Sequence, residues 1–160
     1  MSLVLHTSVV IAWYFEDAST AHTDAVLDQV ANGGAVVPAH WRLDIGDAFQ
    51  TALRQSRTDA IYRDASLAEL ALLPITIDPD TSTYAWSAAL RIAERFSLPL
   101  HEASYLELAH RLALPLAAID QALQRAADQL GVSLGFPYPT RQNDAKGIEQ
   151  FQWVVPRAIG

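Results

Sequence analysis

The chain has 160 residues, 51% of them hydrophobic, and a mean hydropathy of +0.10, which suits one compact domain with a substantial core. No apolar run approaches the roughly 18 residues of a membrane span, and the amino terminus lacks a secretory signal, so the cytoplasm is the expected location. The lack of cysteine excludes disulfides, thiolate nucleophiles and cysteine-based zinc sites. The net charge of -7 argues against a broad basic surface for nucleic acid, although carboxylates around a divalent cation would let that cation meet a phosphate.

Strands and helices are predicted to alternate through the first half of the chain. An apolar run predicts a strand over residues 3–6, and the hydroxyls of Thr7 and Ser8 are expected to cap a helix over residues 9–15. Helical spacing of apolar residues predicts further helices over 19–32, 40–55 and 59–72, with strands over 35–37 and 75–78.

The alternation continues to residue 134 and predicts an α/β fold. Helices are expected over 80–96, 101–112 and 121–130, and strands over 116–120 and 132–134. Short apolar strands between helices indicate a short parallel sheet in a three-layer α/β/α sandwich. Residues 1–134 are therefore predicted to form one domain, and 135–160 a C-terminal extension. Its apolar segment, residues 151–155, is expected to add a strand, to seal a dimer contact or to pack on its own domain.

Four side chains that can bind metal recur at the ends of these predicted elements: His6, Asp44, Glu102 and Asp120. Sites in parallel sheets gather beyond the carboxyl ends of the strands. A convergent acidic cluster can hold a hard cation that activates water and neutralises charge developing on phosphorus. Each residue also has a structural interpretation. His6 is also consistent with a structural histidine held by hydrogen bonds, and Asp44 with a solvated charge on a helix face. Glu102 would interact favourably with the dipole at the start of its helix, and Asp120 would be the N-cap of the helix that follows it.

Four segments carry a family resemblance: Val4–Trp13, Pro38–Asp44, Leu100–Ala109 and Leu116–Asp120. In this order they resemble the PIN-domain ribonucleases, and specifically the VapC-like toxins of type II toxin-antitoxin pairs. The resemblance covers about residues 3–134. It implies a PIN-like fold and RNA cleavage that depends on Mg²⁺ or Mn²⁺.

The resemblance implies that Asp44, Glu102 and Asp120 are catalytic and that they hold the metal together with His6. The family normally carries Asp at the position of His6, Glu at that of Asp44 and Asp at that of Glu102, so only Asp120 keeps the family identity. The first change replaces an anion by an imidazole. It is expected to weaken Mg²⁺ binding and to favour Mn²⁺, Zn²⁺ or Ni²⁺, which accept nitrogen ligands.

Three further residues are predicted to support this site. Asp47 lies one helical turn from Asp44 and is expected to restore the lost negative charge. Thr7 and Ser8 are expected to donate to a phosphate or to orient a metal-bound water, with helix capping as the alternative.

Other polar and aromatic residues carry weaker expectations. His101 is predicted to be a solvated histidine at a helix start, and His40 has no supporting constellation. Trp13, Trp41, Trp86 and Tyr105 stand at helical apolar positions and are expected to lie in the core or in an interface.

The resemblance also implies partners: an RNA substrate, a second copy in a homodimer, and a cognate antitoxin whose basic side chain enters the acidic pocket. Three functions are consistent with the sequence. The first is a metal-dependent endoribonuclease of toxin type. The second is a catalytically silent PIN-like module that binds a partner protein or RNA. The third is a small metal-dependent phosphatase or another hydrolase.

Overall fold

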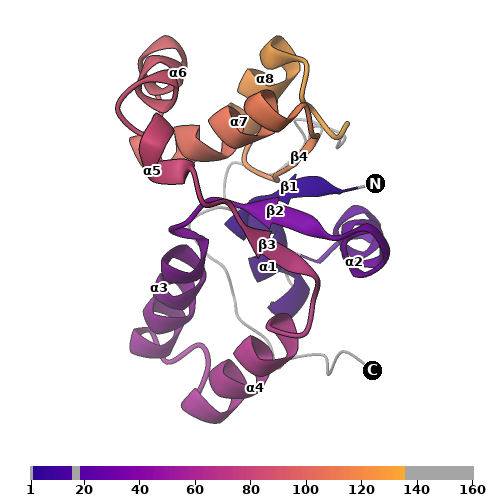
Figure 1. Cartoon of the computed structure of the whole chain (residues 1–160). Coiled ribbons are helices and arrows are strands. Elements are labelled where there is room, and N and C mark those ends of the chain that lie inside the picture. Colours follow the sequence, from indigo (N-terminus) through magenta and orange to yellow (C-terminus); the bar gives the residue numbers. More distant parts are fainter. Residues whose placement is uncertain (1, 16–18, 136–160) are drawn as a thin grey trace, which may run out of the picture.

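A four-stranded parallel sheet lies between two layers of helices in the computed structural model, which describes residues 2–15 and 19–135 (Figure 1). The strand order is β3-β2-β1-β4. The strands are β1 (Leu3–Leu5), β2 (Ala35–Val37), β3 (Ile75–Ile77) and β4 (Leu116–Ala117). The predicted α/β/α architecture is confirmed. The extension beyond Gly135 lies outside the described residues.

Strand β1 is central, and its position explains its composition. It pairs in parallel with β2 on one side, with Leu3 opposite Ala35, and with β4 on the other, with Leu5 opposite Ala117. Both faces of a central parallel strand are covered by helices, so a continuous apolar run is required there. Leu3, Val4 and Leu5 are accordingly fully buried.

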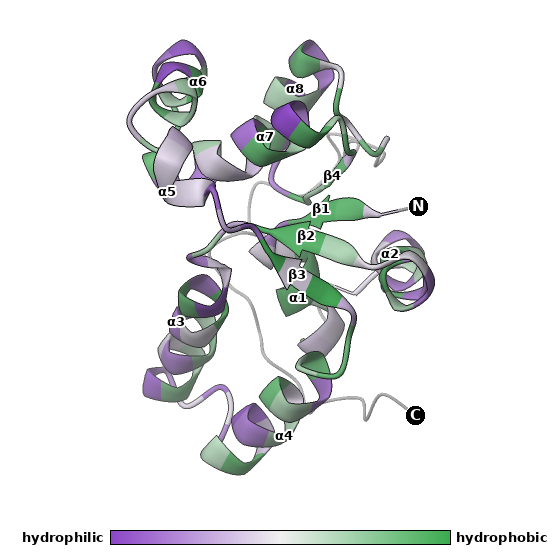
Figure 2. Cartoon of the chain, in the orientation of Figure 1, coloured by the Kyte–Doolittle hydropathy of each residue, from purple (hydrophilic) through white to green (hydrophobic). Residues whose placement is uncertain are grey.

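The helices divide between the two faces of the sheet (Figure 1). One layer contains α1 (Thr7–Tyr14), α2 (Ala21–Gly33), α3 (Trp41–Arg54) and α4 (Ala60–Leu70), and the other contains α5 (Thr81–Tyr84), α6 (Ala88–Phe96), α7 (Leu100–Leu112) and α8 (Gln121–Leu130). Figure 2 shows apolar strands in the middle and helices of mixed polarity around them. Within the described part of the chain, no helix is both long and apolar enough to cross a bilayer.

The single helix predicted over residues 80–96 is wrong, because the chain forms two helices there. The backbone of Ser87, at φ -124° and ψ -98°, leaves the helical region between α5 and α6. The hydroxyl of Thr81 donates to the Asp78 carboxylate at 2.9 Å, so the first turn is held at the end of β3 while α6 packs on α7. Trp86 lies at this break and is exposed, outside the core in which Trp13, Trp41 and Tyr105 are buried.

Two other local predictions need correction. The cap of α1 is His6, whose Nδ1 accepts from the Ser8 backbone N–H, so the helix begins at Thr7 rather than after two capping hydroxyls. The strand predicted over 132–134 is reduced to one parallel bridge, between Ser133 and Leu116. Strand β4 stops at Ala117, because the chain turns there toward the Asp120 cap of α8.

A buried ion-pair network joins the end of β3 to α7. Arg111 on α7 donates to Asp78 at 2.7 Å and to Glu107 at 2.8 Å, and its guanidinium stacks on Tyr84 at 4.4 Å. Asp78 and Glu107 are buried. Burial pushes the pKa of Asp78 upward, but the hydrogen bonds from Arg111 and Thr81 outweigh it, and the pKa lies below its ordinary value.

Replacing the arginine tests this network. We expect Arg111→Met to lower the free energy of unfolding at pH 7 by about 3–5 kcal/mol, because two buried carboxylates lose their cation. Urea unfolding measures the difference. Arg91→Met, at an exposed position on α6, is the matched control and should change stability by less than about 0.5 kcal/mol.

The effect of Arg111→Met should depend on pH. Because the folded pKa of Asp78 is lowered, its ionised form stabilises the fold above the unfolded value of about 3.9, and this stability is lost as the pH falls through the folded pKa. The destabilisation by Arg111→Met should therefore shrink as the pH falls from about 4 to about 2. An equal loss at both pH values would show that the arginine stabilises by packing alone.

Candidate functional site

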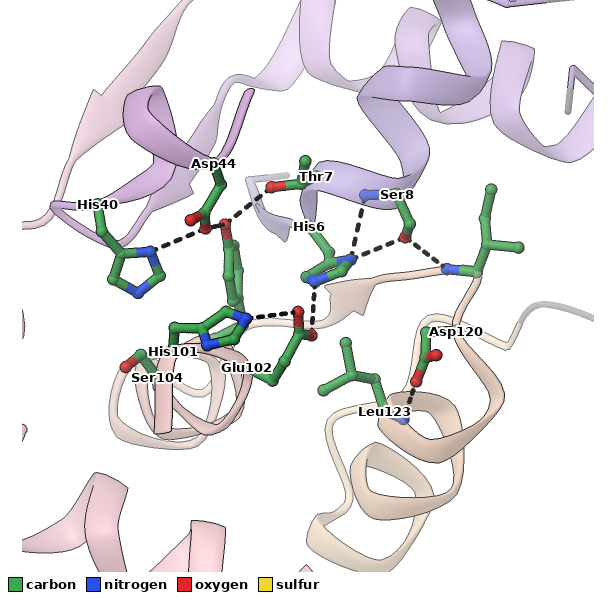
Figure 3. Close-up of polar contacts among 12 residues, drawn as sticks. His6, Thr7, Ser8, His40, Asp44, His101, Glu102, Ser104, Asp120 and Leu123 are labelled. Carbon is green, nitrogen blue, oxygen red and sulfur yellow. Dashed lines mark hydrogen bonds and ion pairs between the residues drawn. The ribbon is translucent and has the colours of Figure 1, made fainter. Parts of the chain in front are cut away.

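The four predicted metal-capable residues lie at the carboxyl edge of the sheet (Figure 3). His6 directly follows β1, and Asp120 precedes α8, just beyond β4. Asp44 and Glu102 stand in the first turns of α3 and α7, on opposite layers of the sandwich. The βα connections thus bring residues that are distant in sequence to one edge, as parallel topology requires.

His6 is buried and engages both ring nitrogens. Its Nδ1 accepts from the Ser8 backbone N–H at 3.1 Å and lies 2.8 Å from the Ser8 hydroxyl, while its Nε2 lies 2.9 Å from Glu102 Oε2. A backbone N–H can only donate, so the lone pair of Nδ1 is in use and the proton belongs on Nε2. The imidazole therefore donates to the carboxylate of Glu102.

Glu102 receives a second histidine from its own helix. The Nε2 of His101 lies 3.3 Å from Glu102 Oε1, on the exposed side of the pocket. Burial tends to raise the pKa of Glu102, but the hydrogen bond from His6 and the fields of His6 and His101 act more strongly in the other direction. The pKa lies below its ordinary value, and the side chain is a carboxylate at neutral pH.

Asp44 is held by a second hydrogen-bonded chain. Its Oδ2 accepts from His40 Nδ1 at 2.9 Å and from the Tyr105 hydroxyl at 2.8 Å. Because Tyr105 donates to Asp44, its oxygen accepts from the Thr7 hydroxyl, 3.0 Å away. Burial raises the pKa of Asp44, whereas the bonds from His40 and Tyr105 lower it by more, so this pKa also lies below its ordinary value.

The remaining predicted residues have structural roles or stand apart. Asp120 Oδ1 accepts from the Leu123 backbone N–H at 2.9 Å and caps α8, and in Figure 3 its side chain turns toward that helix. Ser8 accepts from the Ile119 backbone N–H at 3.0 Å and so joins α1 to the segment after β4. Asp47 is exposed on the surface of α3.

Two residues of the site were missed in the sequence. The sequence offers no constellation for His40 and predicts that Tyr105 lies in the core or in an interface. Tyr105 does lie in the core, and both side chains also bind Asp44. The spacing of His40 and Asp44, one helical turn apart, was a readable signal. The contact of Tyr105 with Asp44 had no such signal, because the two residues are 61 positions apart and stand on helices of opposite layers. Tyr105 is fully buried, with the edge of its ring against His6 at 4.6 Å between centroids.

The donor set of this pocket does not fit a magnesium ion. The nitrogens of His6 are committed to an amide and a carboxylate, and Asp44, Glu102 and Asp120 all accept hydrogen bonds from the chain itself. Among the described residues, no group of three or more histidine or acidic side chains converges closely enough to hold a metal ion. Mg²⁺ binds through several oxygen ligands in near-octahedral geometry, and here at least one oxygen of each of these carboxylates already accepts a hydrogen bond from the protein.

The fold and site together define an α/β protein with a parallel sheet, a topology consistent with PIN-like folds. No protein-family model matches the sequence, and a search of curated proteins finds no match.

Two variants, each of which lacks one hydrogen-bond donor, test the hydrogen bonds of the site. In His6→Phe, which keeps an aromatic ring against Tyr105, we expect the pKa of Glu102 to rise, because burial persists while the imidazole donor is lost. In Tyr105→Phe, the pKa of Asp44 should rise instead. Carboxyl ¹³C NMR titration of both variants measures the two pKa values. An unchanged Glu102 pKa in His6→Phe would mean that the imidazole does not donate to it.

Proposed function

We propose that this chain is a PIN-like protein of the toxin-antitoxin type whose pocket has lost the catalytic metal and receives a cationic side chain of a partner protein. One observation carries the proposal: the imidazole of His6 donates to Glu102 at 2.9 Å. In the resemblance these two positions are both metal-binding aspartates. Here the N–H of one satisfies the carboxylate of the other, so the pair no longer needs a divalent cation.

Charge favours a basic protein segment over RNA as the occupant. The lowered pKa values of Asp44 and Glu102 keep both carboxylates ionised at neutral pH, and the whole chain has a net charge of -7. Without a metal ion these charges repel a phosphate, whereas a guanidinium or ammonium group is attracted and can form charge-assisted hydrogen bonds. A cognate antitoxin that inserts an arginine would fit this pocket.

A metal-dependent ribonuclease is the second candidate. The ionised carboxylates of Asp44 and Glu102 favour it, because hard cations prefer such oxygen ligands. In that case His6, Asp44, Glu102 and Asp120 would hold Mn²⁺ or Zn²⁺ after the hydrogen bonds of the pocket rearrange. RNA cleavage, the homodimer and the phosphatase alternative stay predictions.

Restoring the carboxylate at position 6 separates the two candidates. We expect the native chain to bind Mn²⁺ weakly and to leave RNA intact with Mg²⁺, Mn²⁺ or Zn²⁺. His6→Asp should bind Mn²⁺ about tenfold to hundredfold more tightly, because it replaces a donor by an anionic ligand. Electron paramagnetic resonance titration measures the affinity, and a fluorogenic RNA measures cleavage. His6→Gln, which adds no charge, is the matched control.

RNA cleavage by the native chain would support the ribonuclease candidate instead. If the native chain cleaves RNA with Mn²⁺ and Asp120→Asn abolishes cleavage, the ribonuclease candidate holds and the proposal falls. Asp47→Asn, at an exposed carboxylate on α3, should leave either result unchanged.

An arginine probe tests the proposed occupant directly. We expect the peptide acetyl-Gly-Arg-Gly-amide to give saturable NMR shifts at Glu102 and Asp44, and these shifts should weaken with added salt. Glu102→Gln should abolish the shift at that side chain, while Asp128→Asn, on the exposed surface of α8, should have no effect. Binding that survives Glu102→Gln would place the cation elsewhere.

A further inference from the structure

An apolar groove lies away from the candidate site, at the free edge of the sheet. It is bounded by α3, α4 and β3 and has a volume of about 290 Å³. Its walls include Trp41 and Ile45 of α3, Leu70 of α4, and Ile75 and Ile77 of β3. In Figure 1, α3 and α4 diverge from the sheet on this side.

Two features of its walls point to a peptide strand. First, β3 is the edge strand: among the described strands it pairs only with β2. An edge strand presents backbone donors and acceptors along its outer side, which an added strand can pair with.

Second, the side chains that line the groove are apolar apart from that of Arg42. Such a groove suits the apolar face of an amphipathic strand, while backbone pairing with β3 would hold that strand in place.

We propose that residues 151–155 of the same chain dock in this groove and extend the sheet beyond β3. This segment, Phe-Gln-Trp-Val-Val, alternates large apolar residues with one polar residue and is rich in strand-forming types. Phe151, Trp153 and Val155 would face the groove, and Gln152 and Val154 the solvent, because successive side chains of a strand point to opposite faces.

The chain is long enough to reach the groove. The bridge of Ser133 to Leu116 places the end of the described chain beside β4, at the opposite edge from β3. Four strands at their usual spacing place β3 only about 15 Å from β4. The stretch from Gly135 to Phe151 spans about 50 Å when extended.

Covalent attachment favours this segment over a second copy. A tether of this length holds the segment near its own groove at an effective concentration on the order of millimolar, far above usual protein concentrations. Docking would also cover Trp41, which lies one turn of α3 before Ile45 and directly after His40. None of the residues that line the groove belongs to the proposed cation pocket.

Engineered thiols provide the test, because the chain has no cysteine of its own. In the full-length chain, Thr76→Cys places a thiol on the exposed face of β3, and Gln152→Cys places one on the solvent face of the docked segment while every apolar residue is kept. The matched control pairs Gln152→Cys with Gln50→Cys, an exposed position on α3 outside the groove. Peptide mass mapping after mild oxidation identifies each disulfide.

We expect the Thr76–Gln152 pair to form an intramolecular disulfide at least about tenfold faster than the control pair. Trp153→Ser should slow it to the control rate, while the NMR amide shifts of α7 and α8, on the other layer, should be unchanged because the domain still folds. Equal rates for the two pairs, or a rate that Trp153→Ser leaves unchanged, would overturn the proposal. A disulfide found only between chains, with a yield that rises with concentration, would assign the groove to a second copy instead.

Discussion

His6 is the residue on which the carboxyl edge of the sheet depends, because it joins three elements at once. Its backbone N–H donates to Ala117 at 3.0 Å and holds the end of β1 against β4. Its Nδ1 caps α1, and its Nε2 binds Glu102 of α7 on the opposite layer. The imidazole can do this only with its proton on Nε2, so one tautomer satisfies the helix cap and the carboxylate together. Local backbone structure and pocket electrostatics are therefore coupled through a single ring.

This coupling explains why the two carboxylates of the acidic pocket, Asp44 and Glu102, are both hydrogen-bonded. Asp44 and Glu102 are both ionised, yet each is stabilised by donors from a different helix or loop. Isolated buried charges are strongly unfavourable, so a nuclease-like cluster without these donors would need a cation to be stable. Here histidine and tyrosine provide that stabilisation. The same argument accounts for Asp78 and Glu107, which both bind Arg111 near the end of β3.

The β4 side of the sheet and the β3 edge differ in how far other parts of the chain pack against their strands. Around β1 and β4, helix α7 packs against both strands, and the Ser8 hydroxyl accepts from the Ile119 backbone N–H just beyond β4. At β3 the sheet meets solvent and an apolar groove lined in part by Trp41, Ile75 and Ile77. Side-chain hydrogen bonds are thus concentrated at the candidate site, where the buried Nε2 of His40 nevertheless has no partner among the described residues. The other edge of the sheet carries unpaired backbone groups and apolar surface.

The order of strands and helices was determined by the sequence alone, because buried parallel strands need apolar runs and amphipathic helices need a regular apolar spacing. Those patterns also placed His6, Asp44, Glu102 and Asp120 at the ends of elements. The break after Tyr84 was not readable, since the bond of Thr81 to Asp78 depends on where β3 ends. Nor was the network of the site, because Tyr105 and Asp44 are 61 residues apart and His6 and Glu102 are 96 apart. Only the packing of α3 and α7 around the sheet decides which carboxylate meets which donor, since hydrogen bonds act over about 3 Å and sequence spacing says nothing of such distances between separate elements.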